Sequence, residues 1–252
     1  ETLWYDTLAK DPNSWMAHNN LGSALQLQGK YEEAVRHYRE TLKVKPDSDK
    51  AYYNLGMAYG LRGKSDEALG YFRKALQINP YYAEVYCNMG IVLQEQGKLK
   101  EAIDCYQKGL SINPNDADAH NNWANALQAL GKPDEAINHY YQAIQIKPDY
   151  AQVHNNLGII LRSRGRIDEA IKHYRKAIQI KPDYAEAHNN LANVLVSQGN
   201  LDEAVSYFRE ALRLKGDNPD ICYNLALALQ SQNKFDEAIV NYRQALRLKP
   251  NW

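Results

Sequence analysis

The stretch from Ala151 to Tyr184, AQVHNNLGIILRSRGRIDEAIKHYRKAIQIKPDY, decides the fold of this 252-residue chain. Its apolar residues follow helical spacing in two runs. The runs are Val153, Leu157, Ile160 and Leu161, then Ile167, Ala170, Ile171, Tyr174, Ala177 and Ile178. Gly165 separates them, and glycine readily adopts the left-handed backbone that ends a helix. Because Pro182 disfavours helix in the residue before it, the stretch predicts two helices joined by a short turn.

The same pattern returns every 34 residues without an insertion. The alanine of the segment DEA, or of its equivalent, falls at Ala34, Ala68, Ala102, Ala136, Ala170, Ala204 and Ala238. The predicted repeats are 15–48, 49–82, 83–116, 117–150, 151–184, 185–218 and 219–252, after the second helix of a partial repeat in 1–14. We number the places of each repeat from its first residue. Such units cannot bury their apolar face alone, so residues 1–252 are predicted to form a single all-α solenoid.

Four places of the repeat resemble the tetratricopeptide repeat family over the whole chain. They are a small residue at place 8, alanine at place 20, an aromatic ring at place 24 and proline at place 32, as in Gly158, Ala170, Tyr174 and Pro182. The resemblance implies a right-handed superhelix whose first helices line a concave groove. The sixth repeat departs from the pattern, because Gly216 takes the place of the proline, and we expect a looser turn there.

Composition argues against several functions. Thirty basic and thirty acidic residues give no net charge, which disfavours nucleic acid and anionic membranes as partners. The three cysteines form no CxxC pair, and neither a membrane-spanning apolar run nor a signal peptide is present. We therefore expect a soluble domain without cofactor or metal, placed in the cytoplasm. Because the chain lacks an initiating Met, it resembles a segment of a longer protein, and a membrane-tethered parent stays open.

Histidines occupy places 4 and 23 together in three repeats. The pairs are His18 with His37, His120 with His139, and His154 with His173. A metal ion needs three or four ligands, and no carboxylate or cysteine recurs with the pairs. No GxSxG segment, phosphate-binding glycine loop or converging Ser, His and Asp is visible either. The sequence thus predicts neither a metal site nor an enzyme.

The strongest candidate for a binding site is the asparagine at place 6, which is present in every repeat. Its copies are Asn20, Asn54, Asn88, Asn122, Asn156, Asn190 and Asn224. Asparagine costs a helix about half a kcal/mol relative to alanine, so its amide should form hydrogen bonds that offset this loss. Donor and acceptor together match the backbone of an extended peptide. Repeats about 10 Å apart would meet about every third peptide residue. A structural link to an adjacent helix is the open alternative.

Further candidates lie beside this row. Place 5, which is a variable contact or a filler, and place 9 add Asn121, Asn155, Asn189, Asn125 and Asn193. Place 2 is acidic at Glu84, Asp118, Glu186 and Asp220, so the expected partner is a neutral or mildly basic peptide. A clamp for a peptide carboxylate needs clustered basic residues, whereas Lys50 and Arg162 are the only ones along this face.

These observations predict a non-catalytic scaffold that binds a protein or peptide. Segments such as YAEAHNNLANVL (184–195) resemble the repeat arm of O-linked N-acetylglucosamine transferases, and the opening residues resemble repeats of bacterial membrane glycosyltransferases. That resemblance implies an asparagine ladder that holds substrate backbone, with catalysis outside residues 1–252. Two other functions stay open. One is self-assembly through uncapped solenoid ends, and the other is an RNA-reading helical repeat, which the zero net charge disfavours.

Overall fold

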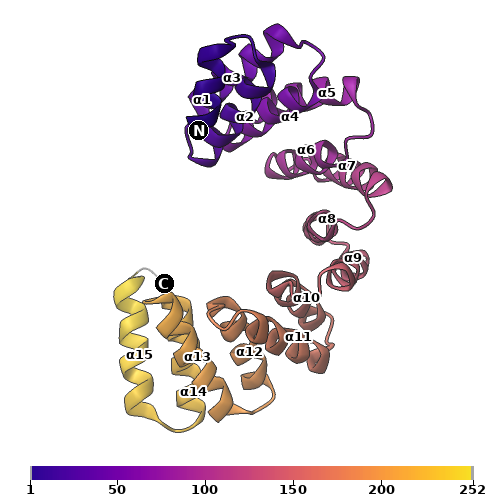
Figure 1. Ribbon diagram of the computed structural model, residues 1–252. Coiled ribbons are helices and arrows are strands. Elements are labelled where there is room, and N and C mark those ends of the chain that lie inside the picture. Colours follow the sequence, from indigo (N-terminus) through magenta and orange to yellow (C-terminus); the bar gives the residue numbers. More distant parts are fainter. Residues whose placement is uncertain (1, 251–252) are drawn as a thin grey trace. The chain divides into compact units, whose positions relative to one another are not determined.

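The computed structural model describes residues 2–250, so residue 1 of the predicted partial repeat and residues 251–252 of the seventh repeat lie outside it. All regular elements in 2–250 are helices (Figure 1). They are α1 Thr2–Lys10, α2 Trp15–Leu27, α3 Tyr31–Val44, α4 Asp49–Leu61, α5 Ser65–Ile78, α6 Ala83–Glu95, α7 Leu99–Ile112, α8 Ala117–Ala129, α9 Pro133–Ile146, α10 Ala151–Ser163, α11 Ile167–Ile180, α12 Ala185–Ser197, α13 Leu201–Lys215, α14 Pro219–Ser231 and α15 Phe235–Leu248. None of these helices combines the length and apolar character needed to cross a membrane.

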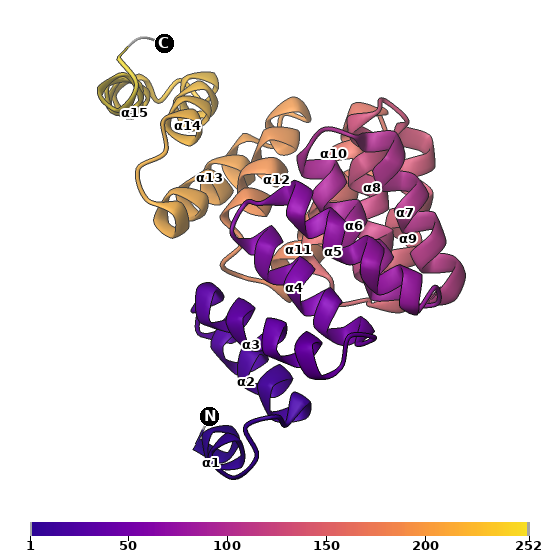
Figure 2. The same ribbon diagram turned by 90° about the horizontal axis from the view of Figure 1, so that it is seen from above.

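The chain divides into two units, of which the first ends at Lys132 and the second begins at Pro133. In the first unit, α2 packs against α3, α4 against α5 and α6 against α7. Each second helix also contacts the next first helix, and α2, α4, α6 and α8 contact one another in succession. Figure 2 shows α4 beside α5 and α2 beside α3 from a second direction. The first helices thus form one layer and the second helices the other.

The second unit repeats this packing. Here α10 pairs with α11, α12 with α13 and α14 with α15, and α10, α12 and α14 contact one another in succession.

In every repeat of both units, the turn residue at place 15 has a positive φ, from 71° at Gly63 to 78° at Gly199 among the glycines. Asn233 takes this conformation with a φ of 61° in the seventh repeat. The prediction of a left-handed helix end at place 15 is therefore confirmed.

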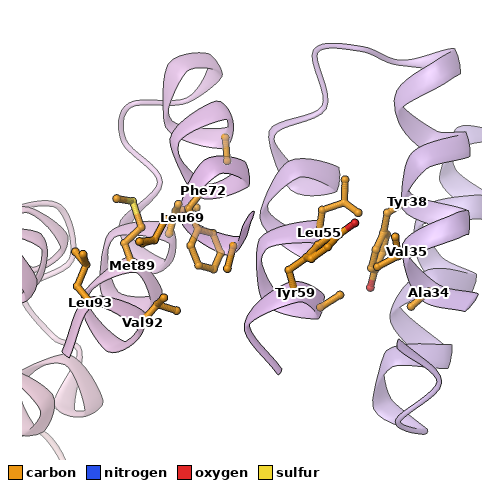
Figure 3. Packing of buried hydrophobic residues seen from close by; sticks show 14 of the residues in the cluster. Ala34, Val35, Tyr38, Leu55, Tyr59, Leu69, Phe72, Met89, Val92 and Leu93 are labelled. Atoms are coloured by element: carbon orange, nitrogen blue, oxygen red, sulfur yellow. The ribbon is translucent and has the colours of Figure 1, made fainter. Parts of the chain in front are cut away.

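The ring at place 24 forms the centre of the first six repeats, whereas its equivalent in the seventh, Tyr242, is only half-buried. Tyr106 is completely buried, and Phe72 is 1% exposed. Figure 3 shows Phe72 among buried hydrophobic side chains of its cluster, with Leu69 next to it. The ring packs against the small residue at place 8 of the first helix, since a Cβ added to Gly90 would lie 2.5 Å from the Tyr106 ring. Place 8 is thus small because two helix backbones approach closely across one aromatic ring.

The sixth repeat ends differently from the others, at the point where its sequence departs from the pattern. Without a proline at place 32, α13 continues to Lys215 and ends at Gly216, whose φ is 72°. Asn218 then caps α14, because its side-chain oxygen accepts a hydrogen bond from the backbone nitrogen of Ile221 at 3.1 Å. In this turn, a glycine instead of a proline therefore ends α13, and an asparagine caps the start of α14.

Candidate peptide-binding surface

The predicted row of asparagines lies along the layer of first helices. Every place-6 asparagine is half-buried. In the first unit the row runs over α2, α4, α6 and α8, and in the second unit over α10, α12 and α14, with the members Asn20, Asn54, Asn88 and Asn122, then Asn156, Asn190 and Asn224. Because these helices contact one another within each unit, the structure brings the members of each group onto neighbouring helices of one surface.

The amide nitrogen at place 6 links successive repeats. Asn54 donates from Nδ2 to Oδ1 of Asn19 at 3.1 Å, and Asn190 donates in the same way to Asn155 at 3.0 Å. In both pairs the acceptor is the place-5 residue of the preceding repeat, 35 residues earlier. A half-buried hydrogen bond of this kind contributes about 1 kcal/mol net, enough to offset the poor helix propensity of asparagine.

Asn88 makes the same link to a different acceptor. Its Nδ2 donates to the hydroxyl of Tyr53 at 3.1 Å and to the backbone oxygen of Glu84 at 2.9 Å. The hydrogen bonds found within residues 2–250 leave the side-chain oxygens of Asn54, Asn88 and Asn190 unused. The amides are therefore held by their donor half while their acceptor half stays available for a backbone N–H group.

The place-5 residues Asn19, Tyr53 and Asn155 support the row, because each accepts a hydrogen bond from the row amide of the next repeat. Asn121 and Asn155 are each 3% exposed, so a peptide on the surface would not reach their side chains. Asn189 is half-buried, and its Oδ1 is buried without a hydrogen-bond partner in the described part of the chain. The two place-9 candidates, Asn125 and Asn193, are half-buried one turn beyond the row.

A sequence signal for this link exists. Every place-5 residue carries a side-chain atom able to take part in a hydrogen bond, because place 5 holds only asparagine, tyrosine or cysteine. Asn122 shows a variation, since its Oδ1 accepts a hydrogen bond from Nδ2 of Asn121 at 3.2 Å. Its acceptor is therefore used, unlike those of Asn54 and Asn88.

Carboxylates make this surface acidic near the start of α6. Burial, the neighbouring Tyr53 and the carboxylates of Glu84 and Asp49 raise the pKa of Tyr82 to about 12. In the second unit, the place-2 residue Glu186 is instead paired with Lys215 at 3.3 Å. The local field at α6 thus favours a basic group on a ligand.

Exposed apolar side chains are the feature of this surface that the site prediction does not include. Leu27 at place 13 of α2 is 90% exposed, and Leu61 at the same place of α4 is 55% exposed. Met57, one turn before Leu61, is half-buried. Apolar groups of this kind, when gathered on one face, are typical of protein-binding surfaces. They could have been found by reading place 9 together with place 13.

The histidine pairs form hydrogen bonds between paired helices. His18 and His37 approach with their Nδ1 atoms 2.9 Å apart, and His154 and His173 do the same. Within residues 2–250, no group of three or more His, Cys, Asp or Glu side chains is arranged to hold a metal ion. Burial raises the pKa of the Cys87 thiol to about 12, so this cysteine is not a reactive thiolate.

Comparisons with known proteins agree with the helical-repeat fold. Residues 6–222 match the family model of the cilia and flagella-associated protein 70 C-terminal domain, and residues 219–251 match the tetratricopeptide repeat model. Both models describe repeat domains, and no model of a catalytic family matches. No curated protein matches the sequence.

Three solved structures illustrate the likeness. MamA shares 28% identity over 64% of this chain and 94% of its own, with a TM-score of 0.60. Pseudomonas aeruginosa PilF shares 24% identity over 81% and 93%, with a TM-score of 0.73. YrrB, described as a TPR protein with an unusual peptide-binding site, shares 24% identity over 73% and 95%, with a TM-score of 0.58. The predicted all-α tetratricopeptide fold is confirmed.

Proposed function

We propose, since the chain belongs to the family of the cilia and flagella-associated protein 70 C-terminal domain, that it is a scaffold whose first helices bind an extended protein segment. Tetratricopeptide domains are in general protein-interaction scaffolds. One observation carries the finer proposal. Oδ1 of Asn54 and of Asn88 has no hydrogen-bond partner in residues 2–250, while the same amides are anchored through Nδ2.

This arrangement suits a peptide backbone. The Nδ2 hydrogen bonds of Asn54 and Asn88 hold each amide plane in place. Little side-chain entropy is therefore lost when a peptide N–H binds to Oδ1. The side chains of the peptide would not be read by these amides, so the row contributes affinity without sequence preference. The peptide-binding site named in the description of YrrB supports the proposal by analogy of fold alone. The family name makes ciliary and flagellar proteins the first partners to test.

The test separates the row from the link that supports it. The row variant is Asn54→Ala with Asn88→Ala. The matched variant is Asn19→Ala with Tyr53→Phe, which removes the acceptors of the same two links and keeps both row amides. We expect each lost link to cost about 1 kcal/mol of stability, offset by about half a kcal/mol wherever alanine replaces asparagine. The row variant should bind peptides selected from a displayed library about tenfold more weakly, because two hydrogen bonds are lost, whereas the matched variant keeps both Oδ1 acceptors and should lose clearly less affinity.

The outcome is read by titrating a selected, fluorescently labelled peptide against both variants and by urea unfolding of each. Equal losses of stability with unchanged peptide affinity in both variants would make the asparagines structural links and nothing more. A library that yields no binder to the unaltered chain would remove the proposal itself.

Two narrower forms of the proposal follow from the sequence. The resemblance to O-linked N-acetylglucosamine transferases favours an arm that recruits protein substrates for a catalytic domain outside this chain, and the backbone-binding amides support that use. Self-association through the helices at the ends of the array is the other form. It is supported by the exposed apolar residues of α15, namely Phe235, Ile239 and Val240.

A further inference from the structure

A tyrosine and a glutamine close the gap above the central ring in several repeats. The tyrosine at place 24 donates from its hydroxyl to the side-chain oxygen of the glutamine at place 12 of the first helix. The pairs are Tyr38 with Gln26 at 3.1 Å, Tyr106 with Gln94 at 3.0 Å and Tyr242 with Gln230 at 2.7 Å. The glutamine side chain thus covers the ring on the side of the first helices.

The second repeat lacks both members of this pair. Phe72 stands at place 24 and Gly60 at place 12, so neither the hydroxyl nor the covering side chain is present. A pocket of about 120 Å³ opens there, between α4 and α6. Met57, Gly60 and Leu61 line it from α4, Ile91 and Glu95 from α6, and Phe72 from α5.

Neither the backbone nor the packing requires glycine at this position. Gly60 lies inside α4 and is not among the residues with positive φ. A Cβ at Gly60 would lie 3.8 Å from Cγ2 of Val92 and 3.9 Å from Cβ of Ala68, which are ordinary contacts. The sixth repeat also has a phenylalanine at place 24, Phe208, yet carries Val196 at place 12. Gly60 therefore costs the helix about 1 kcal/mol relative to alanine and leaves the pocket open.

The walls of the pocket indicate what would fill it. A cavity of about 150 Å³ lined by apolar side chains is known to hold a benzene-sized molecule, so this slightly smaller pocket suits one aliphatic side chain. Met57 is an adaptable lining residue, because its thioether chain is flexible and polarizable. The space is open on the surface of the first helices, where Leu61 is 55% exposed.

The polar groups at the rim define the rest of the ligand. Glu95 is exposed, and no salt bridge or hydrogen bond to its carboxylate is found within residues 2–250. Asn88, which also lines the pocket, presents the Oδ1 acceptor described above.

We propose that the pocket around Gly60 is an anchor site for a protein segment that carries an aliphatic side chain beside a lysine or arginine. The aliphatic side chain fills the space between Met57 and Ile91. The basic group pairs with Glu95, and a backbone N–H of the segment donates to Asn88. This inference rests on the proposed function, and it adds a sequence preference that the asparagine row alone does not provide.

The test uses a defined peptide and a local probe. The peptide is acetylated and amidated Gly-Lys-Leu-Gly, and the controls are Gly-Lys-Ala-Gly and Gly-Glu-Leu-Gly. The three methionines, Met16, Met57 and Met89, are labelled at their methyl carbons for NMR. Met57 lines the pocket, whereas Met89 is 9% exposed in the core and reports that the fold is intact. We expect a saturable shift of the Met57 signal with the leucine peptide and at least tenfold weaker binding of the alanine peptide.

Two variants complete the experiment. Gly60→Leu fills the pocket and should weaken binding of the leucine peptide at least tenfold while the Met89 signal stays in place. Glu95→Gln keeps the shape and should abolish the preference for the lysine over the glutamate peptide. Three results would each overturn the proposed anchor site. They are an unshifted Met57 signal, equal binding of the leucine and alanine peptides, and unaltered binding of the leucine peptide by Gly60→Leu. Library peptides that bind through the row without an aliphatic preference would leave the scaffold function standing and remove the anchor site.

Discussion

Two glycines one turn apart on α4 serve opposite purposes. A Cβ at Gly56 would lie 2.5 Å from the ring of Phe72, so this glycine permits the close approach of α4 and α5. A Cβ at Gly60 would meet nothing closer than 3.8 Å. Both residues have ordinary helical backbone, so the difference between them lies in packing and not in conformation.

We therefore predict that alanine has opposite effects at these two positions. Gly56→Ala should lower the free energy of unfolding by about 1–3 kcal/mol, because the ring must move in a filled core. Gly60→Ala should raise it by about 1 kcal/mol through helix propensity. Urea unfolding followed by circular dichroism measures both. Changes of the same sign would show that the two sites do not differ in packing as described.

At the scale of single residues, the sequence predicts which residues belong to the candidate site but not which contacts they make, for a physical reason. The place-6 row follows from its unbroken recurrence and from the cost of asparagine in a helix. The partner of each amide was not predictable, because the contact joins residues 35 apart on helices whose rotation is set by packing. The pocket was equally hidden, since it depends on the joint absence of a side chain at Gly60 and of a ring hydroxyl at Phe72.

Paired helices carry the histidine contacts, and their geometry assigns the protons. Nε2 of His154 lies 3.1 Å from the backbone oxygen of Pro148, which can only accept, so Nε2 carries the hydrogen. Nδ1 of His154 is then an acceptor, and Nδ1–H of His173 donates to it. Burial and the neighbouring His154 lower the pKa of His173 to about 4, although Glu169 opposes the shift.

This pair predicts a loss of stability in mild acid. In the unfolded chain histidine has a pKa of about 6.5, so between pH 6.5 and about 4 the unfolded state binds more protons than the folded state. The contribution of the neutral pair to the free energy of unfolding should be fully present above pH 6.5 and should be lost toward pH 4. We expect a loss of only about 1–2 kcal/mol, because the half-buried ring is partly screened by water. Urea unfolding at several pH values measures the decline.

The control is His173→Asn, which places an amide donor near the position of Nδ1 and does not titrate. We expect the variant to reduce the slope of stability against pH between 6.5 and 4. A variant that declines as steeply as the original chain would assign the acid sensitivity to other groups, such as His37, whose pKa is also lowered by burial.

Within the unit that begins at Pro133, the second helix of each repeat does not bury the same number of side chains. α11 buries Ala170, Ile171, Tyr174 and Ala177, whereas α15 buries only Ala238 and Ala245. Ile239 and Val240 on α15 are 46% and 62% exposed. In an array of repeats stability is close to a sum of local and nearest-neighbour terms, so α15 has fewer of the contacts that hold it folded.

We predict that backbone amides of α15 exchange with solvent at least about tenfold faster than those of α11, through local opening. Hydrogen exchange followed by mass spectrometry or NMR on the intact chain measures both helices in one sample. Equal protection would mean that the second unit opens as one cooperative body. It would also mean that the poor burial of α15 has no energetic consequence.

At the scale of the whole molecule, the fold was the most predictable property. The 34-residue period, the glycine at place 15 and the ring at place 24 together specify the helices and their pairing. The late end of α13 is an irregularity that the missing proline indicates, although the asparagine cap that replaces it becomes clear only in the structure. The division after Lys132 has no counterpart in the repeat pattern, since it falls inside the predicted repeat 117–150.

The links between repeats join residues at fixed separations along the sequence, and this affects how the number of repeats can change in evolution. Amide links join residues 35 apart, and surface contacts such as Arg62 with Glu32 and Gln96 with Asp66 join residues 30 apart. Loss of residues 49–82 by unequal crossing-over would set Asn88 against Asn19, a pair of the kind that Asn54 already makes. Gln96 would likewise meet Glu32. The fixed offsets therefore allow this repeat to be lost while the contacts between its former neighbours are rebuilt.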